Sequence, residues 1–440
     1  MPARLYMLQM NSDERMEDTV RKTTSDASFG RRIKLLIYSV GPGIFLIGYN
    51  IGTGSVTTMA ASGSRYGMSL FWALLLSCIF TYVMLVAYGK YTLVTGRTAI
   101  SSYNQYFGRG ISIFMMIGLI IGELAALMGI MGIVVNMISY WVLYMTGYQI
   151  NKIVITIIII AGLYYLFWIG RYVRFEKLLM IFVTLMGISF ITSMILVIPD
   201  ATEVVKGLVP KIPKEENADL IVAGMAGTTL SAILFVMRSI VVQEKGWGIG
   251  DLRQEKRDAF VSALMMLILS AAVMACAAGT LFPLGVPVET VKEMVVTLEP
   301  MAGKFAITLF LIGIVSAGLS TVFPIILIAP WLFSDYMNKP RVIQSKMYRI
   351  LGASAILLGL IVPVFGGRPV LIMIASQAFQ ALLMPLVTIA IIILLNRKSV
   401  MKQHKAGLWM NIGCGATFIF SLVMAYSGIV GLIDQIKTIV

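Results

Sequence analysis

Two apolar stretches of this chain are interrupted by glycines and hydroxyl side chains, and these interruptions hold the residues best suited to chemistry. They are Gly52, Thr53, Gly54 and Ser55 in the first stretch, and Thr228, Thr229 and Ser231 in the second. An unwound membrane helix leaves N–H and C=O groups that hydrocarbon cannot satisfy, so such a break survives only beside protein or a wet cavity. Free amides, carbonyls and nearby hydroxyls predict a binding site for a small solute or ion near the bilayer midplane.

Two ionisable residues, Glu123 and Arg238, also fall within apolar stretches. An ionisable group at membrane depth is costly and is therefore a candidate for function. We expect Glu123 and Arg238 to lie at similar depth and to form a charged pair. The alternatives are that Arg238 extends to the membrane interface, or that the two residues serve coupling or gating.

The interruptions offer poor ligands for a transition metal, which prefers thioether, imidazole or carboxylate groups. No Asp, Glu, Cys or His stands near them, and only Met59 and Met225 lie at their edges. The single histidine, His404, sits in a basic loop, and the three cysteines show no paired spacing. The sequence thus predicts no metal site, no disulfide framework and no resident cofactor, and it leaves a proton or sodium open as coupling ion. No catalytic motif is present, so we do not expect an enzyme.

The composition is that of an integral membrane protein. Of 440 residues, 58% are hydrophobic and 13% charged, with a mean hydropathy of +0.89. The net charge of +14 would suit a nucleic-acid partner, but the basic residues concentrate in alternate loops, which indicates topology instead. We therefore expect no nucleic-acid binding, a cytoplasmic N-terminus, an extracytoplasmic C-terminus and a multi-pass protein of the cell membrane.

Eleven apolar stretches approach the roughly 20 residues that cross a bilayer. They are 35–63, 68–94, 111–144, 151–169, 175–199, 219–243, 259–284, 303–335, 347–366, 370–395 and 408–432. Divided as five, five and one, the second set runs inverted to the first, and the two interrupted stretches then occupy matching positions. The predicted parts are a flexible tail at 1–34, repeats at 35–200 and 201–398, and a loop with the last helix at 399–440.

Several stretches resemble the Nramp family in order and spacing. They are GPG at 41–43 with the interrupted first span, AGTTLSAILFVMRSIVVQEK at 226–245, GLSTVFPIIL at 318–327 and ASQAFQALLMPL at 375–386. Nramp proteins are secondary transporters that typically move manganese or iron with protons. The resemblance implies an all-α membrane protein of the LeuT type, built as a 5+5 inverted repeat with discontinuous first and sixth helices, that works by alternating access.

The chain departs from the family at its metal site. The family carries Asp-Pro-Gly-Asn in the first break, where this chain has Gly52–Ser55, and Met-Pro-His in the sixth, where it has Ser231–Ile233. A second family histidine corresponds to Arg238, whereas the acid of the third span is kept as Glu123 and the glutamine of the tenth as Gln377. The resemblance thus carries over the scaffold and leaves out the side-chain metal ligands.

Two hypotheses for the substrate follow. The first is a secondary-active transporter for a small non-metal solute, such as an anion or carboxylate. The alternative is a divalent cation transporter for hydrated magnesium, or for manganese or iron, with proton coupling left open. In both, the predicted site joins the hydroxyls and glycines of the two breaks to Gln377. The expected partners are a small solute or ion and the bilayer, and the expected state is a monomer.

Overall fold

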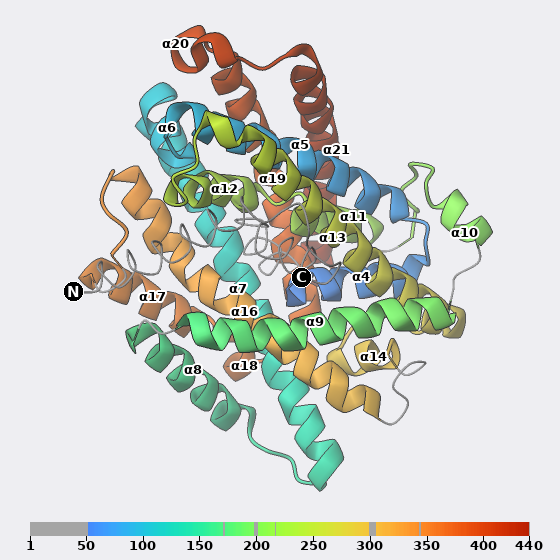
Figure 1. Ribbon diagram of the computed structural model, residues 1–440. Coiled ribbons are helices and arrows are strands. Elements are labelled where there is room, and N and C mark those ends of the chain that lie inside the picture. Colours follow the sequence, from blue (N-terminus) through green and yellow to red (C-terminus); the bar gives the residue numbers. More distant parts are fainter. Residues whose placement is uncertain are drawn as a thin grey trace, which may run out of the picture.

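A computed structural model describes residues 52–169, 172–197, 201–215, 217–298, 305–342 and 345–439 of the chain. All the regular secondary structure in these residues is helical (Figure 1). The helices are α4 Thr53–Tyr66, α5 Phe71–Thr95, α6 Ala99–Tyr106, α7 Arg109–Thr146, α8 Lys152–Ile169, α9 Tyr172–Val197, α10 Ala201–Lys206, α11 Ala218–Thr229, α12 Ala232–Glu244, η1 Ile249–Asp251, α13 Leu252–Thr280, η2 Phe282–Leu284, α14 Val291–Val296, α16 Ala306–Tyr336, α17 Lys346–Leu358, α18 Ile361–Phe365, α19 Pro369–Asn396, α20 Lys398–Met401, η4 Lys402–His404 and α21 Leu408–Ile439.

Within the described residues, eight helical stretches are long and apolar enough to cross a bilayer. Two further apolar helices, Lys152–Trp168 and Ile181–Val197, are shorter. The helices coincide with the second to eleventh predicted spans to within several residues. Residues 35–51 of the first predicted span and the tail at 1–34 lie outside the described residues, so the total of eleven and the tail stay predictions.

The break in the sixth span is confirmed. Helix α11 ends at Thr229, Leu230 leaves the helical region with φ −99° and ψ 58°, and α12 begins at Ala232 with Ser231 as its extended N-cap. In the first span, α4 begins at Thr53 and is preceded by Gly52 in an extended conformation. The residues before Gly52 are not described, so the first break is seen from one side.

The helices that surround the two interruptions pack closely. Helix α13 packs on α4, α5 and α9, helix α11 packs on α4 and α5, and helix α16 packs on α7 and α9 (Figure 1). Helix α19 lies against α7, α11 and α21. A Cβ atom at Gly227 would lie 1.8 Å from the carbonyl oxygen of Gln377, so the backbone of α11 touches that of α19. This approach requires glycine and brings α19 to the break in the sixth span.

Candidate functional site

A cavity of about 40 Å³ lies where α4 begins and where α11 gives way to α12. Six of the residues predicted from the two breaks and the tenth span line it together: Gly52, Gly54, Ser55, Thr228, Ser231 and Gln377. A water molecule needs roughly 10–15 Å³ of such space. In this conformation the cavity therefore has room for a few waters or a small ion, and none for a large organic solute.

Two other predicted residues, Thr53 and Thr229, do not line the cavity. The Thr53 hydroxyl donates to the Ile314 carbonyl at 3.3 Å. The Thr229 hydroxyl donates to the Met225 carbonyl, one turn back in its own helix. Both side chains stabilise neighbouring backbone, which is a common use of threonine at helix ends. The sequence could not tell them from the hydroxyls that face the cavity.

Three side chains form a hydrogen-bonded chain across the cavity wall. The Ser231 hydroxyl donates to Gln380 Oε1 at 2.8 Å, and Gln380 Nε2 donates to Glu123 Oε1 at 2.6 Å. Gln380 was not among the predicted residues, although it lies three positions after Gln377. That spacing places both amides on one face of α19 and could have identified it.

Gln377 lies over the start of α4. The Thr58 hydroxyl donates to Gln377 Oε1. A Cβ atom at Gly54 would lie 2.2 Å from Gln377 Nε2, so glycine leaves the room for this amide. Ser55 exchanges a hydrogen bond of 3.1 Å with Ser270 of α13. The start of α4 is thereby joined to α13 on one side and α19 on the other.

The carboxylate of Glu123 is part of the cavity wall, although its side chain comes from the middle of α7. It is 3% exposed. The expectation that no acidic side chain stands near the breaks is therefore wrong, because α7 packs beside α19 and brings Glu123 to the level of Gln380. When ionised, the Glu123 carboxyl group supplies the cavity wall with a negative charge that a cation could neutralise.

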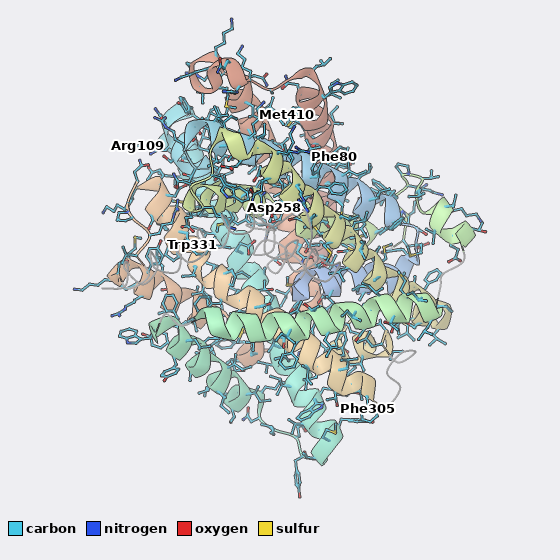
Figure 2. All side chains as sticks on the ribbon, viewed as in Figure 1. Phe80, Arg109, Asp258, Phe305, Trp331 and Met410 are labelled. Carbon is cyan, nitrogen blue, oxygen red and sulfur yellow. The ribbon has the colours of Figure 1, made fainter. Side chains whose placement is uncertain are left out.

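The expected charged pair of Glu123 and Arg238 is also wrong, because Arg238 has other partners. Arg238 donates from Nε to Glu255 at 2.9 Å and from its second terminal nitrogen at 2.7 Å, and its remaining nitrogen lies 2.5 Å from Asp258. All three side chains are buried, and Asp258 lies inside the bundle (Figure 2). The predicted span began at residue 259, yet α13 begins at Leu252, and its first two turns carry the carboxylates that pair with the buried guanidinium.

Besides Gln380, the described residues outside the predicted set that line the cavity are Ala126, Ile130, Gly227, Thr321, Ile325 and Met373. Thr321 lies within the 318–327 motif, and a Cβ atom at Gly52 would meet its hydroxyl at 2.2 Å. Met373 contributes a thioether to the cavity lining, and its methyl carbon lies beside Gly54. Among the described residues, no three His, Cys, Asp or Glu side chains gather as they would around a metal ion.

A family model, known proteins and solved structures each match most of this chain. A family model described as natural resistance-associated macrophage protein-like matches residues 43–431. A divalent metal cation transporter, MntH of Brucella suis, is 23% identical over 426 residues, which cover 92% of this chain and 90% of that protein. A structure of a mutant manganese transporter of Eremococcus coleocola superposes with a TM-score of 0.71 at 15% identity over 94% and 90% of the two chains. Mhp1, a nucleobase-cation-symport-1 family transporter, gives 0.58 at 15% identity over 91% of each chain.

Proposed function

The chain belongs to the Nramp family, and on that premise we propose that it carries a hard divalent cation through the cavity between α4, α11 and α12. Its fold is the LeuT type with a discontinuous sixth helix, and it is a multi-pass membrane transporter, not an enzyme. Relatives with long coverage are divalent metal cation transporters by name. The cation is the substrate of this proposal and not a resident cofactor.

The observation that carries the proposal is the buried carboxylate of Glu123 among hydroxyl and amide groups. Magnesium prefers oxygen ligands and keeps several of its own waters, so one carboxylate and a few neutral oxygens can hold it. Manganese also accepts such ligands. The cavity of about 40 Å³ fits an ion with a few waters. We therefore place magnesium and manganese ahead of softer metals.

A second candidate, a small anionic solute, has one observation in its favour. Both α4 and α12 begin at the cavity, at Gly52 and Ser231. Helix N-termini favour negative charge. The carboxylate of Glu123 opposes an anion in the same space, and for that reason we place this candidate second.

Thermal unfolding of the purified protein with magnesium, manganese, cadmium or small anions tests the proposal. A ligand that binds the folded state raises the melting temperature by mass action. We expect a shift with magnesium or manganese that is lost in Glu123→Gln and kept in Asp434→Asn, which changes an exposed carboxylate. A shift with anions alone would overturn the proposal. A cadmium shift that Met373→Leu abolishes would instead place a soft metal on the Met373 thioether.

We further propose the topology and assembly that the sequence predicts. The basic loops support a cytoplasmic N-terminus and an extracytoplasmic C-terminus, and the proposed repeats are 35–200 and 201–398. The proposed unit is a monomer in the bilayer, driven by a proton or sodium gradient.

A further inference from the structure

Two arginines gather around one tyrosine at the end of the molecule where α6 and α20 lie (Figure 1). Arg97 follows α5, Tyr106 is the last residue of α6, and Arg397 is the C-cap of α19. Arg97 donates from Nη1 to the Tyr106 hydroxyl at 3.2 Å and also to Gln105 Oε1. The Arg397 guanidinium lies over the Tyr106 ring, 4.8 Å from its centroid. We call Arg97, Gln105, Tyr106 and Arg397 the arginine–tyrosine cluster.

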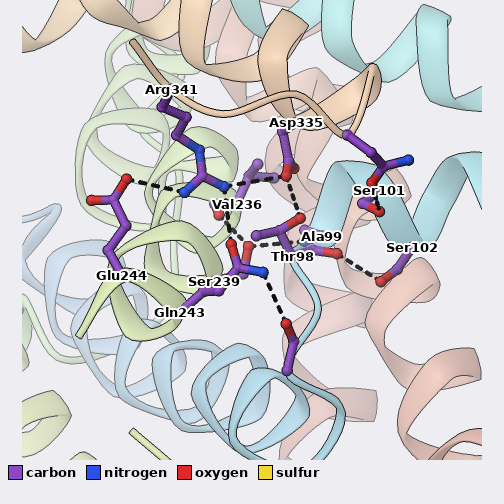
Figure 3. A network of polar contacts seen from close by, with 12 residues as sticks. Thr98, Ala99, Ser101, Ser102, Val236, Ser239, Gln243, Glu244, Asp335 and Arg341 are labelled. Carbon is purple, nitrogen blue, oxygen red and sulfur yellow. Dashed lines mark hydrogen bonds and ion pairs between the residues drawn. The ribbon is translucent and has the colours of Figure 1, made fainter. Parts of the chain in front are cut away.

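The backbone that carries Arg97 is held on both sides. On one side, Gln243 Nε2 donates to the Gly96 carbonyl at 2.8 Å. On the other side, the Thr98 hydroxyl donates to Asp335 (Figure 3). Because the turn between α5 and α6 is fixed and Tyr106 already positions the side chain, a ligand of Arg97 pays little of the usual ordering entropy.

The cluster has no carboxylate to balance its charge. Among the described residues, none of the ion pairs includes Arg97 or Arg397. Glu244 and Asp335, which lie beyond the turn, both pair with Arg341 instead (Figure 3). The two guanidiniums belong to exposed residues, and their contacts within the cluster are with neutral side chains. Two positive charges are therefore available to an anion.

An exposed apolar face of α19 leads to the cluster. Leu386, Ile389 and Ile393 are exposed, and their spacings of three and four residues place them on one face that ends at Arg397. On a helix that crosses a bilayer, an exposed apolar face contacts the acyl chains of lipids. Arg397 thus lies where this face reaches the headgroup region.

Helix α7 repeats this arrangement beside the cluster. Arg109 begins α7, three residues after Tyr106, and lies at the outside of the helix bundle (Figure 2). Ile113, Ile117 and Ile121 are exposed and follow it at spacings of four residues. Helices α7 and α19 pack against each other. The basic groups are therefore bordered by apolar faces of two neighbouring helices.

We propose that the arginine–tyrosine cluster binds the phosphate group of an anionic phospholipid. A guanidinium donates two parallel hydrogen bonds to phosphate oxygens, a geometry that an ammonium group lacks. Basic residues beside the ends of membrane helices attract anionic headgroups. A phosphate at Arg397 places the acyl chains along the exposed face of α19, which a soluble phosphate would leave uncovered. The bound lipid would join the α5–α6 turn to the end of α19. This site is independent of the proposed cation.

Native mass spectrometry of the purified protein, titrated in detergent with phosphatidylglycerol, tests the site. We expect the double variant Arg97→Gln/Arg397→Gln to bind this lipid about tenfold more weakly than the parent. The matched control is Arg253→Gln/Arg257→Gln, which removes two exposed arginines from the start of α13 and lowers the net charge equally. Its affinity should stay within about twofold of the parent. Phosphatidylcholine with the same acyl chains should bind the parent more weakly than phosphatidylglycerol does.

The tyrosine gives a second test that leaves the net charge unchanged. Tyr106→Leu removes the ring beneath Arg397 and the hydroxyl that accepts from Arg97, and it should also weaken phosphatidylglycerol binding. Tyr106→Phe keeps the ring and should lose less. Melting temperatures without lipid identify any variant that fails to fold.

Three results would overturn the proposal. The first is equal affinity for phosphatidylglycerol in the parent and in Arg97→Gln/Arg397→Gln. The second is an equal loss in the α13 control pair, which would mean that surface charge alone attracts the lipid. The third is competition by glycerol 3-phosphate at the concentration of the lipid, which would make a soluble phosphate the ligand. The measurement needs no divalent cation, so a failure of cation binding would overturn the proposed function alone.

Discussion

Replacing Glu123 with glutamine removes the cavity's charge and preserves its shape. Gln380 Nε2 now donates to Glu123 Oε1 at 2.6 Å, and it can donate equally to an amide oxygen. An ion in a cavity of about 40 Å³ lies close to every wall. At roughly 4 Å, a divalent ion and a carboxylate interact by about 2 kcal/mol even at the dielectric constant of water, twice the value for two unit charges. We therefore expect the dissociation constant for magnesium or manganese to rise at least about thirtyfold.

Isothermal titration of the purified variant with manganese and magnesium measures this effect directly. Asp434→Asn serves as the control, because it removes an exposed carboxylate that is paired with Lys437 on α21. Its dissociation constant should stay within about twofold of the parent. A change of less than about threefold in Glu123→Gln, in protein that unfolds at the parent's temperature, would refute the placement of the cation beside this carboxylate.

Three further substitutions test the packing around the cavity. Gly227→Ala should lower stability by about 1–3 kcal/mol, seen as a lower melting temperature, since its Cβ would meet the Gln377 carbonyl at 1.8 Å; a rise would disprove the close approach. Gln377→Leu should weaken cation binding, because it removes an amide from the cavity wall, and should lower the melting temperature, because it leaves the buried Thr58 hydroxyl without its acceptor; equal affinity would exclude Gln377 as a ligand. Arg238→Met should destabilise by about 3–5 kcal/mol by leaving Glu255 and Asp258 buried without it. Neutralising all three residues together should recover part of that loss, and a triple variant no more stable than the single one would contradict this account.

The break in the sixth span could be predicted because composition alone marks it. Glycine and threonine gather in the middle of an apolar run, where an ordinary helix has no need of them, and Leu230 and Ser231 leave the helix there. Span boundaries follow from hydropathy in the same way. The span at 259–284 was predicted to begin too late, because residues 251–258 are strongly charged and hydropathy alone excludes them from an apolar helix.

The partners of the charged residues could not be predicted, because they depend on how helices far apart in sequence lie beside one another. Glu123 and Gln380 are 257 residues apart, and even Arg238 and Glu255, which are 17 residues apart, lie on two separate helices, α12 and α13. Hydropathy places each residue at a depth but gives no rotation about the helix axis. The predicted pair of Glu123 and Arg238 is wrong because Arg238 pairs with Glu255 and Asp258, whereas Glu123 accepts from Gln380.

On the proposed function, the cavity would bind its cation through oxygen ligands. The resemblance to the family implies a methionine at the position of Ser231. In this chain the Ser231 hydroxyl donates to Gln380, which in turn donates to the Glu123 carboxyl group. In the proposed site, Ser231 would thus orient an oxygen ligand where the resemblance implies a thioether. Hard oxygen ligands select ions by charge and hydration and discriminate little by softness. If Glu123 is the main ligand, magnesium should compete with manganese for the site, and a site that binds manganese while excluding a large excess of magnesium would require the Met373 thioether as a ligand instead.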